Sequence, residues 1–400
     1  MRSYYLFLKG NFSPVFFGWL LTFLSSFGQT FFISLFVPGI LTEFGFSKSA
    51  FGSYYALATV IASFFLLQFG HLVDQGHTRL ITARTNILLA VSCALLGIAI
   101  HPVMVFLALI GLRLGGQGLM SHISMSVISR HFTADRGKAL SLSSLGYPMG
   151  EMFFPIAAGA ILAFWDWRTA LLLSAFLLFL TLISFSRINL EVFDTGVSTR
   201  TDAQQSKWKY IGQIASGKAF WILILPVFLF GFVSTALFFF QYLMAEAKGW
   251  SIEWYSLCFT GYAASRLIFM LYGGILTDRF SARNLFPFLL IPLTFGLLAL
   301  ALIPGKLAPL LFLLLTGISS GANNVISTAV LAELYGTGRV GQVRSLFSMV
   351  LVLSTALAPV ALGFLLDHGV GFEQFTLACA AVIIPVTINS FRIRRVESRL

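Results

Sequence analysis

The segment Gly70-His-Leu-Val-Asp74-Gln-Gly76-His-Thr-Arg79 interrupts a long apolar run with an acid, two glycines and a base. A segment of the same kind, Gly274-Ile-Leu-Thr-Asp278-Arg279-Phe-Ser-Ala-Arg283, begins 204 positions later. In both segments a glycine stands four residues before the aspartate, at the end of a hydrophobic stretch. Two such loops at one spacing indicate that the chain is a duplicated unit.

The same spacing of 204 positions recurs outside the two loops. Gly45-Phe46-Ser47 aligns with Gly249-Trp250-Ser251. Pro155-Ile-Ala-Ala-Gly159 aligns with Pro359-Val-Ala-Leu-Gly363. Chance recurrence of glycine and proline would explain one such match, but not one register that is kept through both halves.

The composition excludes a water-soluble globule. Of the 400 residues 58% are hydrophobic and only 10% are charged, and the mean hydropathy is +0.88. Soluble domains carry about 25% charged residues. The three cysteines, Cys93, Cys258 and Cys379, lie far apart inside apolar runs, so we expect no disulfide framework, no metal site and no cofactor.

The apolar runs have the length of membrane spans, because about 20 residues cross the hydrocarbon core as a helix. They lack the two-residue alternation of barrel strands. We therefore expect an all-α membrane protein with twelve transmembrane helices in two six-helix pseudo-symmetric bundles, residues 1–187 and 219–400, joined by a cytoplasmic linker at 188–218. The expected spans are roughly 14–41, 50–72, 83–100, 103–129, 139–164, 169–186, 219–244, 252–276, 285–303, 307–332, 344–366 and 373–391.

The basic residues predict the orientation. If the N-terminus is cytoplasmic, Arg113 and Arg266 lie inside spans, and 20 of the other Lys and Arg residues lie on the cytoplasmic side. The opposite side then holds only four, Lys48, Arg168, Lys248 and Lys306. This bias predicts that both termini are cytoplasmic. It also explains the net charge of +11 without nucleic acid, since basic loops face an anionic leaflet.

The two loops resemble the signature loop of the major facilitator superfamily of secondary transporters. The first copy matches it at Gly70, Asp74 and Arg79, although Gln75 stands where the family usually has a basic residue after the aspartate. The resemblance covers essentially the whole chain, and it implies that this loop locks the helix ends in one transport state. The residues with this expected gating role are Gly70, Asp74, Arg79, Gly274, Asp278, Arg279 and Arg283.

Within that superfamily the details resemble the monocarboxylate and oxalate–formate branch. Phe17-Gly18-Trp19 opens the first span as in that branch, and Arg113-Leu-Gly-Gly116-Gln117-Gly118 lies in the fourth. Arg266 stands twelve residues before Asp278, also as in that branch. The branch often has an aspartate one turn before this arginine, where the present chain has Tyr262, so a proton mechanism through that aspartate is excluded.

Only Arg113, Glu151 and Arg266 are charged residues deep inside expected spans. A charge at the bilayer centre costs about 2.5–3.5 kcal/mol even on the most lenient scale, so such residues face protein or a wet cavity. Two arginines against one carboxylate leave one positive charge, which predicts an anionic substrate, because a guanidinium binds a carboxylate with two hydrogen bonds. The alternative for Arg113 is a purely structural pairing.

Glu151 has two interpretations. It pairs with Arg113 across adjacent spans, or it carries a coupled proton because burial raises the pKa of an unpaired carboxyl. Further candidate substrate ligands are the polar side chains of Gln29, Gln117 and Asn323. For these three the alternative is hydrogen bonding between helices.

We therefore expect a monomeric secondary transporter of a small organic anion, a mono- or dicarboxylate, in a bacterial-type inner or plasma membrane. It would work by alternating access with proton coupling or exchange. The carboxylates are scattered, and no nucleophile–base pair, phosphate loop or metal-ligand spacing is present, so an enzyme is not expected. The alternatives are an efflux transporter of hydrophobic or drug-like compounds and a transporter-like sensor.

Overall fold

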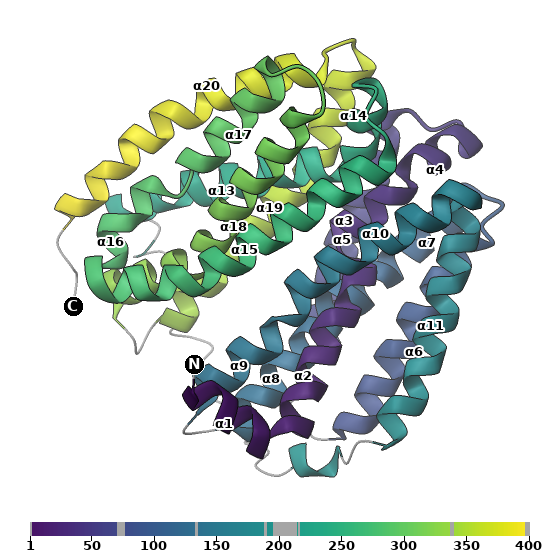
Figure 1. The fold of residues 1–400 in the computed structure, drawn as a ribbon, viewed down its shortest axis with the longest axis horizontal. Coiled ribbons are helices and arrows are strands. Elements are labelled where there is room, and N and C mark those ends of the chain that lie inside the picture. The colour runs from purple at the N-terminus through teal and green to yellow at the C-terminus, as the bar shows by residue number, and fades with distance from the viewer. Residues whose placement is uncertain are drawn as a thin grey trace. The chain divides into compact units, whose positions relative to one another are not determined.

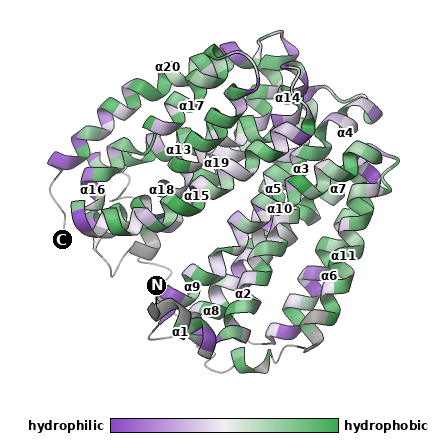
Figure 2. Cartoon of the chain, viewed as in Figure 1, coloured by the Kyte–Doolittle hydropathy of each residue, from purple (hydrophilic) through white to green (hydrophobic). Residues whose placement is uncertain are grey.

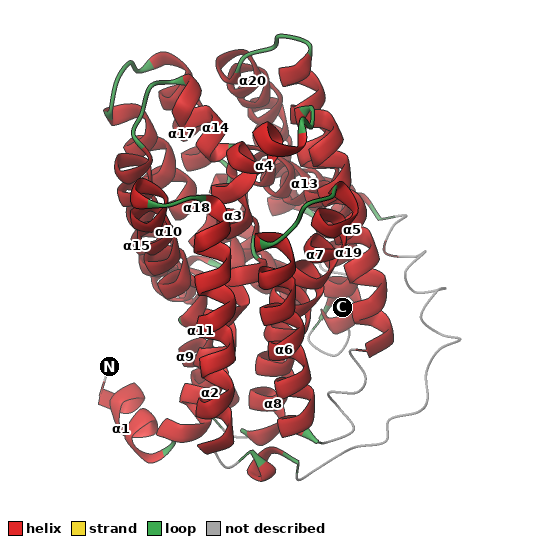
Figure 3. Cartoon of the chain, turned by 90° about the vertical axis from the view of Figure 1, so that its right-hand side faces the viewer, coloured by secondary structure: helices red, strands yellow, loops and turns green. Residues whose placement is uncertain are grey.

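The protein is built from helices. The computed structural model describes residues 2–69, 77–132, 135–187, 190–194, 214, 217–336 and 340–396, and every regular element in this part of the chain is helical (Figure 3). The expectation of an all-α membrane protein is confirmed.

The described helices account for the expected spans. Ten are long and apolar enough to cross a membrane, and the bent pair Phe12–Gly28 and Thr30–Phe44 makes an eleventh if it is one span. The expected span at 169–186 falls on the shorter apolar helix Trp167–Ile183. The ten are Lys48–Leu66, Thr78–Gly97, Pro102–His131, Arg136–Phe164, Lys218–Phe239, Ile252–Thr277, Ala282–Leu302, Leu307–Tyr335, Leu346–Asp367 and Phe372–Arg395.

The chain divides into two compact units. The first contains Met1–Phe46 and Tyr54–Arg200, and the second contains Ser47–Ser53 and Thr201–Leu400. In Figure 1 the helices of the first unit run from purple to teal, and those of the second from green to yellow. Most of the linker expected at 188–218 lies outside the described residues.

In the first unit α6 packs against α7 and α11, while α2 packs against α8, α9 and α10. Its elements are α1 (Arg2–Gly10), α2 (Phe12–Leu24), η1 (Ser25–Gly28), α3 (Thr30–Ile33), η2 (Ser34–Phe36), α4 (Val37–Phe44), α5 (Lys48–Phe69, which begins in the second unit), α6 (Thr78–Gly97), α7 (Pro102–Leu112), η4 (Arg113–Met120), α8 (Ser121–His131), α9 (Arg136–Ser144), α10 (Gly146–Phe164), α11 (Trp167–Arg187) and η5 (Glu191–Phe193).

In the second unit α15 packs along α18, α13 along α19, and α17 against both α18 and α20. Its elements are α13 (Lys218–Phe239), α14 (Gln241–Ala247), α15 (Ile252–Phe280), α16 (Ala282–Leu285), η6 (Phe286–Phe288), α17 (Ile291–Leu302), α18 (Leu307–Tyr335), α19 (Val340–Asp367), α20 (Phe372–Ser390) and η7 (Phe391–Arg395).

Hydrophobic residues predominate along the helices of both units (Figure 2), and large apolar side chains are found both exposed and buried. Ile100 and Phe164 are 86% and 80% exposed, whereas Phe17 and Phe312 are fully buried. Water would penalise so much exposed apolar area, but hydrocarbon does not. The exposed faces are therefore the lipid-facing sides of the spans, and polar residues inside the units stand out as exceptions to be explained.

Candidate functional site

The first span breaks at Gln29. Between η1 and α3 the backbone of Gln29 is extended, with φ −83° and ψ 153°, and the two parts of the span are bent by 43°. Just before the break, the Ser25 hydroxyl donates to the Thr22 carbonyl at 2.6 Å, which competes with the helical hydrogen bond of that carbonyl. Gly28 adds backbone freedom at the last residue of η1.

The fourth span widens into a π-helix, η4, over Arg113–Met120. Its sequence, Arg-Leu-Gly-Gly-Gln-Gly-Leu-Met, contains three glycines, which tolerate the looser backbone. Irregular turns of this kind are frequent at functional sites. In transporters, interrupted helices mark the place where substrate binds.

The break and the π-helix meet through two glycines. A Cβ on Gly28 would lie 2.7 Å from Gly116 Cα, and a Cβ on Gly116 would lie 2.5 Å from Gly28 Cα and from Gly28 N. The two backbones are therefore closer than any side chain permits. This contact places Arg113, the first residue of the π-helix, beside the end of η1.

The Arg113 side chain holds the break together. Its Nη1 donates to the Gly28 carbonyl at 3.1 Å, and its Nε donates to Thr59 Oγ1 at 3.1 Å. The Tyr55 ring lies over the guanidinium with its centroid 4.8 Å from Cζ, and the Tyr55 hydroxyl lies 2.7 Å from Thr30 Oγ1. Arg113 is only 3% exposed. A cation at the end of η1 also complements the negative end of the helix dipole.

The partners of Arg113 are neutral. The two hydrogen bonds go to a carbonyl and a hydroxyl oxygen. Glu151 is 7% exposed on α10. The site thus contains a buried guanidinium, which carries five N–H donors in all, bound to two neutral oxygens.

Two of the predicted amides flank this cluster. Gln29 is half-buried at the break, and Gln117, one turn after Arg113 on η4, is exposed. Most of η4 is buried, and Gln117 is its exposed residue.

In the second unit Arg266 is half-buried on α15. The backbone there is fixed by α18, because a Cβ on Gly321 would lie 2.8 Å from Met270 N and closer still to the Arg266 carbonyl. Tyr262, one turn before Arg266, is buried and donates from its hydroxyl to Ser320 Oγ at 3.3 Å. Asn323 accepts a hydrogen bond from Ser327 on the same helix.

The signature loops are described in part. Gly70 and Asp74 lie outside the described residues, and Arg79 is exposed in the first turn of α6. In the second copy Gly274 is half-buried near the end of α15, and the side chain of Asp278 lies outside the described part.

The bases of the second copy make local contacts. Cζ of Arg279, itself exposed, lies 5.2 Å from the Phe280 ring centroid. Arg283 Nη1 donates to the Val396 carbonyl at 2.8 Å.

The sequence interpretation missed two carboxylates, each of which caps the start of the helix that follows one of the loops. Asp194 accepts from Thr78 N at 2.9 Å and from Thr78 Oγ1 at 2.7 Å, at the start of α6. Glu333 accepts from Ala282 N at 2.7 Å and from Arg283 N at 3.1 Å, at the start of α16. Each carboxylate satisfies N–H groups that a helix start leaves without a partner. No local sequence signal links either acid to its helix.

The sequence interpretation also missed Tyr55 and Thr59 as partners of Arg113. They stand four residues apart on α5, so they share one face of that helix. A polar pair at this spacing inside an apolar span was the available signal.

Comparison with protein families supports the resemblance of the loops. The family model described as Major Facilitator Superfamily matches residues 18–359 and 239–399. A comparison with curated proteins gives no match.

Solved transporters share the fold at low sequence identity. A bacterial homologue of the human lysosomal transporter Spinster is similar with a TM-score of 0.77 and 14% identity, covering 96% of each chain. The nucleoside transporter NupG has a TM-score of 0.74 and 13% identity over 96% of this chain and 100% of its own. A D-xylose–proton symporter has a TM-score of 0.73 and 17% identity over 97% and 98%.

These structures differ in what their names say they carry, so they identify the architecture and not the cargo. The family match covers far more than half of the chain. The chain therefore belongs to the Major Facilitator Superfamily: it is an integral multi-pass membrane protein and a secondary transporter, not an enzyme.

Proposed function

We propose that this transporter moves a small organic anion, a mono- or dicarboxylate, across a bacterial-type inner or plasma membrane by alternating access, with both termini in the cytoplasm. The observation that carries the proposal is Arg113, 3% exposed and hydrogen-bonded to neutral oxygens of Thr59 and Gly28. The branch of the family that the sequence resembles agrees with this choice.

The electrostatic argument concerns the cost of burial. A buried charge destabilises its surroundings unless it is paired. Hydrogen bonds to a carbonyl and a hydroxyl compensate part of that cost, but they do not neutralise the charge. A substrate carboxylate that accepts from this guanidinium would do so, and a charge-assisted hydrogen bond is roughly twice as strong as a neutral one.

In this proposal the cationic substrate ligands are Arg113 in the first unit and Arg266 in the second. Gln29, Gln117 and Asn323 orient the uncharged part of the substrate. The exposed position of Gln117 supports its role, since a side chain engaged between helices would be buried. The signature-loop residues Gly70, Asp74, Arg79, Gly274, Asp278, Arg279 and Arg283 gate the cycle.

Two measurements on the purified protein test the substrate class. We expect oxalate, lactate or succinate to raise its melting temperature in detergent, whereas organic cations of equal size do not, because ligands that bind the folded state stabilise it. Proteoliposomes should then accumulate the labelled acid that gives the largest shift. Stabilisation by cations or hydrophobic drugs alone would favour the efflux alternative, and binding without uptake would favour the sensor.

Proton coupling is proposed to pass through Glu151, which is 7% exposed on α10. We expect Glu151→Gln to lose uptake driven by an inward proton gradient while it keeps exchange of labelled for unlabelled acid at equal pH. The reason is that exchange needs no net proton movement, whereas symport does. Full gradient-driven uptake by Glu151→Gln would exclude proton carriage by this residue.

A further inference from the structure

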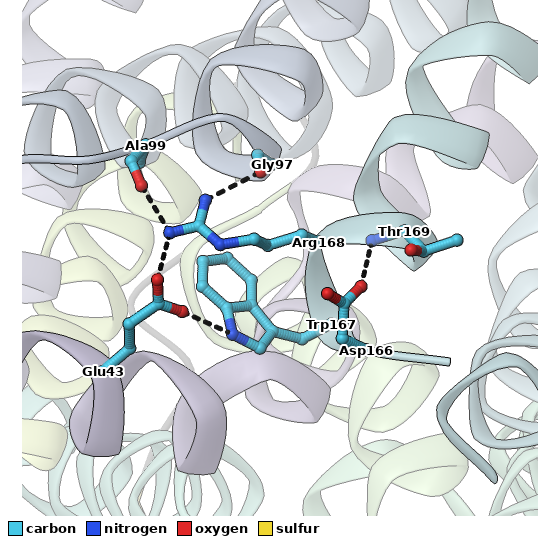
Figure 4. Close-up of polar contacts among 7 residues, drawn as sticks. All are labelled: Glu43, Gly97, Ala99, Asp166, Trp167, Arg168 and Thr169. Carbon is cyan, nitrogen blue, oxygen red and sulfur yellow. Dashed lines mark hydrogen bonds and ion pairs between the residues drawn. The ribbon is translucent and has the colours of Figure 1, made fainter. Parts of the chain in front are cut away.

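An ion pair joins α4 to α11 within the first unit (Figure 4). Arg168, the second residue of α11, pairs with Glu43 near the end of α4 through Nη2 and Oε1. The same guanidinium donates to the Gly97 carbonyl at 2.9 Å and to the Ala99 carbonyl at 2.6 Å, just where α6 ends. The indole N–H of Trp167 donates to Glu43 Oε2 at 3.2 Å. We call Glu43, Trp167 and Arg168 the α4–α11 staple.

The second unit has an ion pair in the corresponding place. Lys248, the residue after α14, pairs with Glu373, the second residue of α20. Its Nζ also lies 3.4 Å from the Leu300 carbonyl, near the end of α17. We call Lys248 and Glu373 the α14–α20 staple.

The two staples are copies with reversed charge. In each, the paired residues are 125 positions apart, and the second pair lies 205 positions after the first. The first unit has the acid at the end of its first span and the base at the start of its last. The second unit has the base first and the acid last, yet the base still reaches a carbonyl at the end of the third span of its own unit.

Each staple fastens a short helix that follows a longer helical segment of its unit. α4 has 8 residues and follows the break at Gln29, while α14 has 7 residues and follows the end of α13 at Phe239. Helices this short are not stable alone. Packing reinforces the first staple, because a Cβ on Gly39 of α4 would meet the Trp167 ring within 3.0 Å.

Both ion pairs are only partly shielded from water. Side-chain exposure is 23% for Arg168 and 43% for Glu43, and 19% for Lys248 and 61% for Glu373. Ion pairs this exposed contribute little through charge alone. They contribute to stability mainly because the same basic side chain also binds backbone carbonyls at the end of the third span. These carbonyls have no hydrogen-bond partner within their own helix.

We propose that the staples are positioning elements of the transport machinery: each one binds a short helix, α4 or α14, to the last span of its unit. The break at Gln29, with the carbonyl of Gly28 that Arg113 binds, then keeps its geometry while the bundle moves as one body. The proposed role requires opposite charges at the two paired positions, but it does not matter which of the two positions carries the acid. The proposal depends on the family assignment and not on the anionic substrate.

The α11 end of the first staple is itself fixed. Asp166, just before α11, accepts from Thr169 N at 2.8 Å (Figure 4), and this backbone hydrogen bond lowers the pKa of Asp166. An ionised carboxylate at this position caps the helix that carries Arg168. Asp166 is not part of the ion pair, so it provides a matched control.

Hydrogen–deuterium exchange of the full-length protein in lipid nanodiscs tests the proposal without a known substrate. We expect Glu43→Gln and Arg168→Gln to speed amide exchange in residues 25–44 roughly two- to fivefold, as loss of a partly exposed pair that also holds backbone groups implies. The double variant Glu43→Lys with Arg168→Glu, which copies the order of the second unit, should restore protection. Lys248→Gln should act on residues 241–247 and leave 25–44 unchanged.

Asp166→Asn removes a neighbouring charge but keeps a capping side chain, so it should leave exchange in residues 25–44 as in the wild type. Unchanged exchange in both single Gln variants would overturn the proposal. So would a charge-swapped variant that exchanges as fast as the singles, because the sign at each position would then matter. Fast exchange through the whole first unit in the single variants would show a general stabilising role and would also overturn it.

Discussion

Gly116→Ala is expected to prevent native packing of the first bundle, whereas Gly115→Ala and Gly118→Ala, within two residues of it, are expected to be tolerated. A Cβ on Gly116 would lie 2.5 Å from two backbone atoms of Gly28, and backbone atoms cannot turn aside as a side chain can. Overpacking in well-packed interiors costs typically 1–3 kcal/mol, and more when backbone must move. The expected result is a large loss of monodisperse protein and a melting temperature lower by several degrees, roughly 4 °C or more.

The neighbouring glycines provide the controls. The nearest atom to a Cβ on Gly115 is Leu89 Cβ at 3.4 Å, and the nearest to a Cβ on Gly118 is the Arg113 carbonyl at 3.5 Å, both ordinary contact distances. Gly28→Ala should reproduce the defect of Gly116→Ala from the other side. If the melting temperature of Gly116→Ala equals those of Gly115→Ala and Gly118→Ala instead of lying well below them, the close contact between the two spans would be contradicted.

Hydropathy predicted the helices because each span must be long and apolar, and every expected range coincides with described helices. It missed the break in the first span. Residues 14–41 read as one span, since Ser25, Ser26 and Gly28 are neutral enough for a membrane, and an average over the window hides a single extended residue. A break is decided by local hydrogen bonds, such as that of the Ser25 hydroxyl, and not by hydropathy.

The candidate site was predicted by its charges and not by its contacts. Arg113 stood out because a cation inside an apolar run is costly. Its partners on α5 did not stand out, since Tyr and Thr are ordinary in spans and their relation to Arg113 depends on how two helices pack. Of the staple residues, the sequence interpretation counted only Arg168 and Lys248, as loop charges, although Glu43 and Arg168 stand at the same spacing as Lys248 and Glu373.

Replacement of Arg113 is expected to separate anion recognition from the structural work of the same side chain. Arg113→Gln removes the charge, and hydrogen bonds to charged groups are worth about 1.5–3 kcal/mol. We therefore expect roughly tenfold to hundredfold weaker binding of the organic acid that stabilises the wild type. Arg113→Lys keeps the charge but not the planar fork, so it should retain weaker binding and the preference for acids over cations.

Thr59→Val isolates the structural contribution. It removes the acceptor of Arg113 Nε at 3.1 Å but leaves the charge and the bond to the Gly28 carbonyl. The melting temperature should fall by a few degrees, about 2–4 °C, because a buried donor loses its partner, while the acid-induced stabilisation persists. Arg84→Gln, an exposed arginine on α6, controls for loss of one positive charge and should change neither quantity. If Arg113→Gln lowered the melting temperature but bound the acid as tightly as the wild type, Arg113 would be a brace for the break at Gln29, and the anion would have to bind elsewhere.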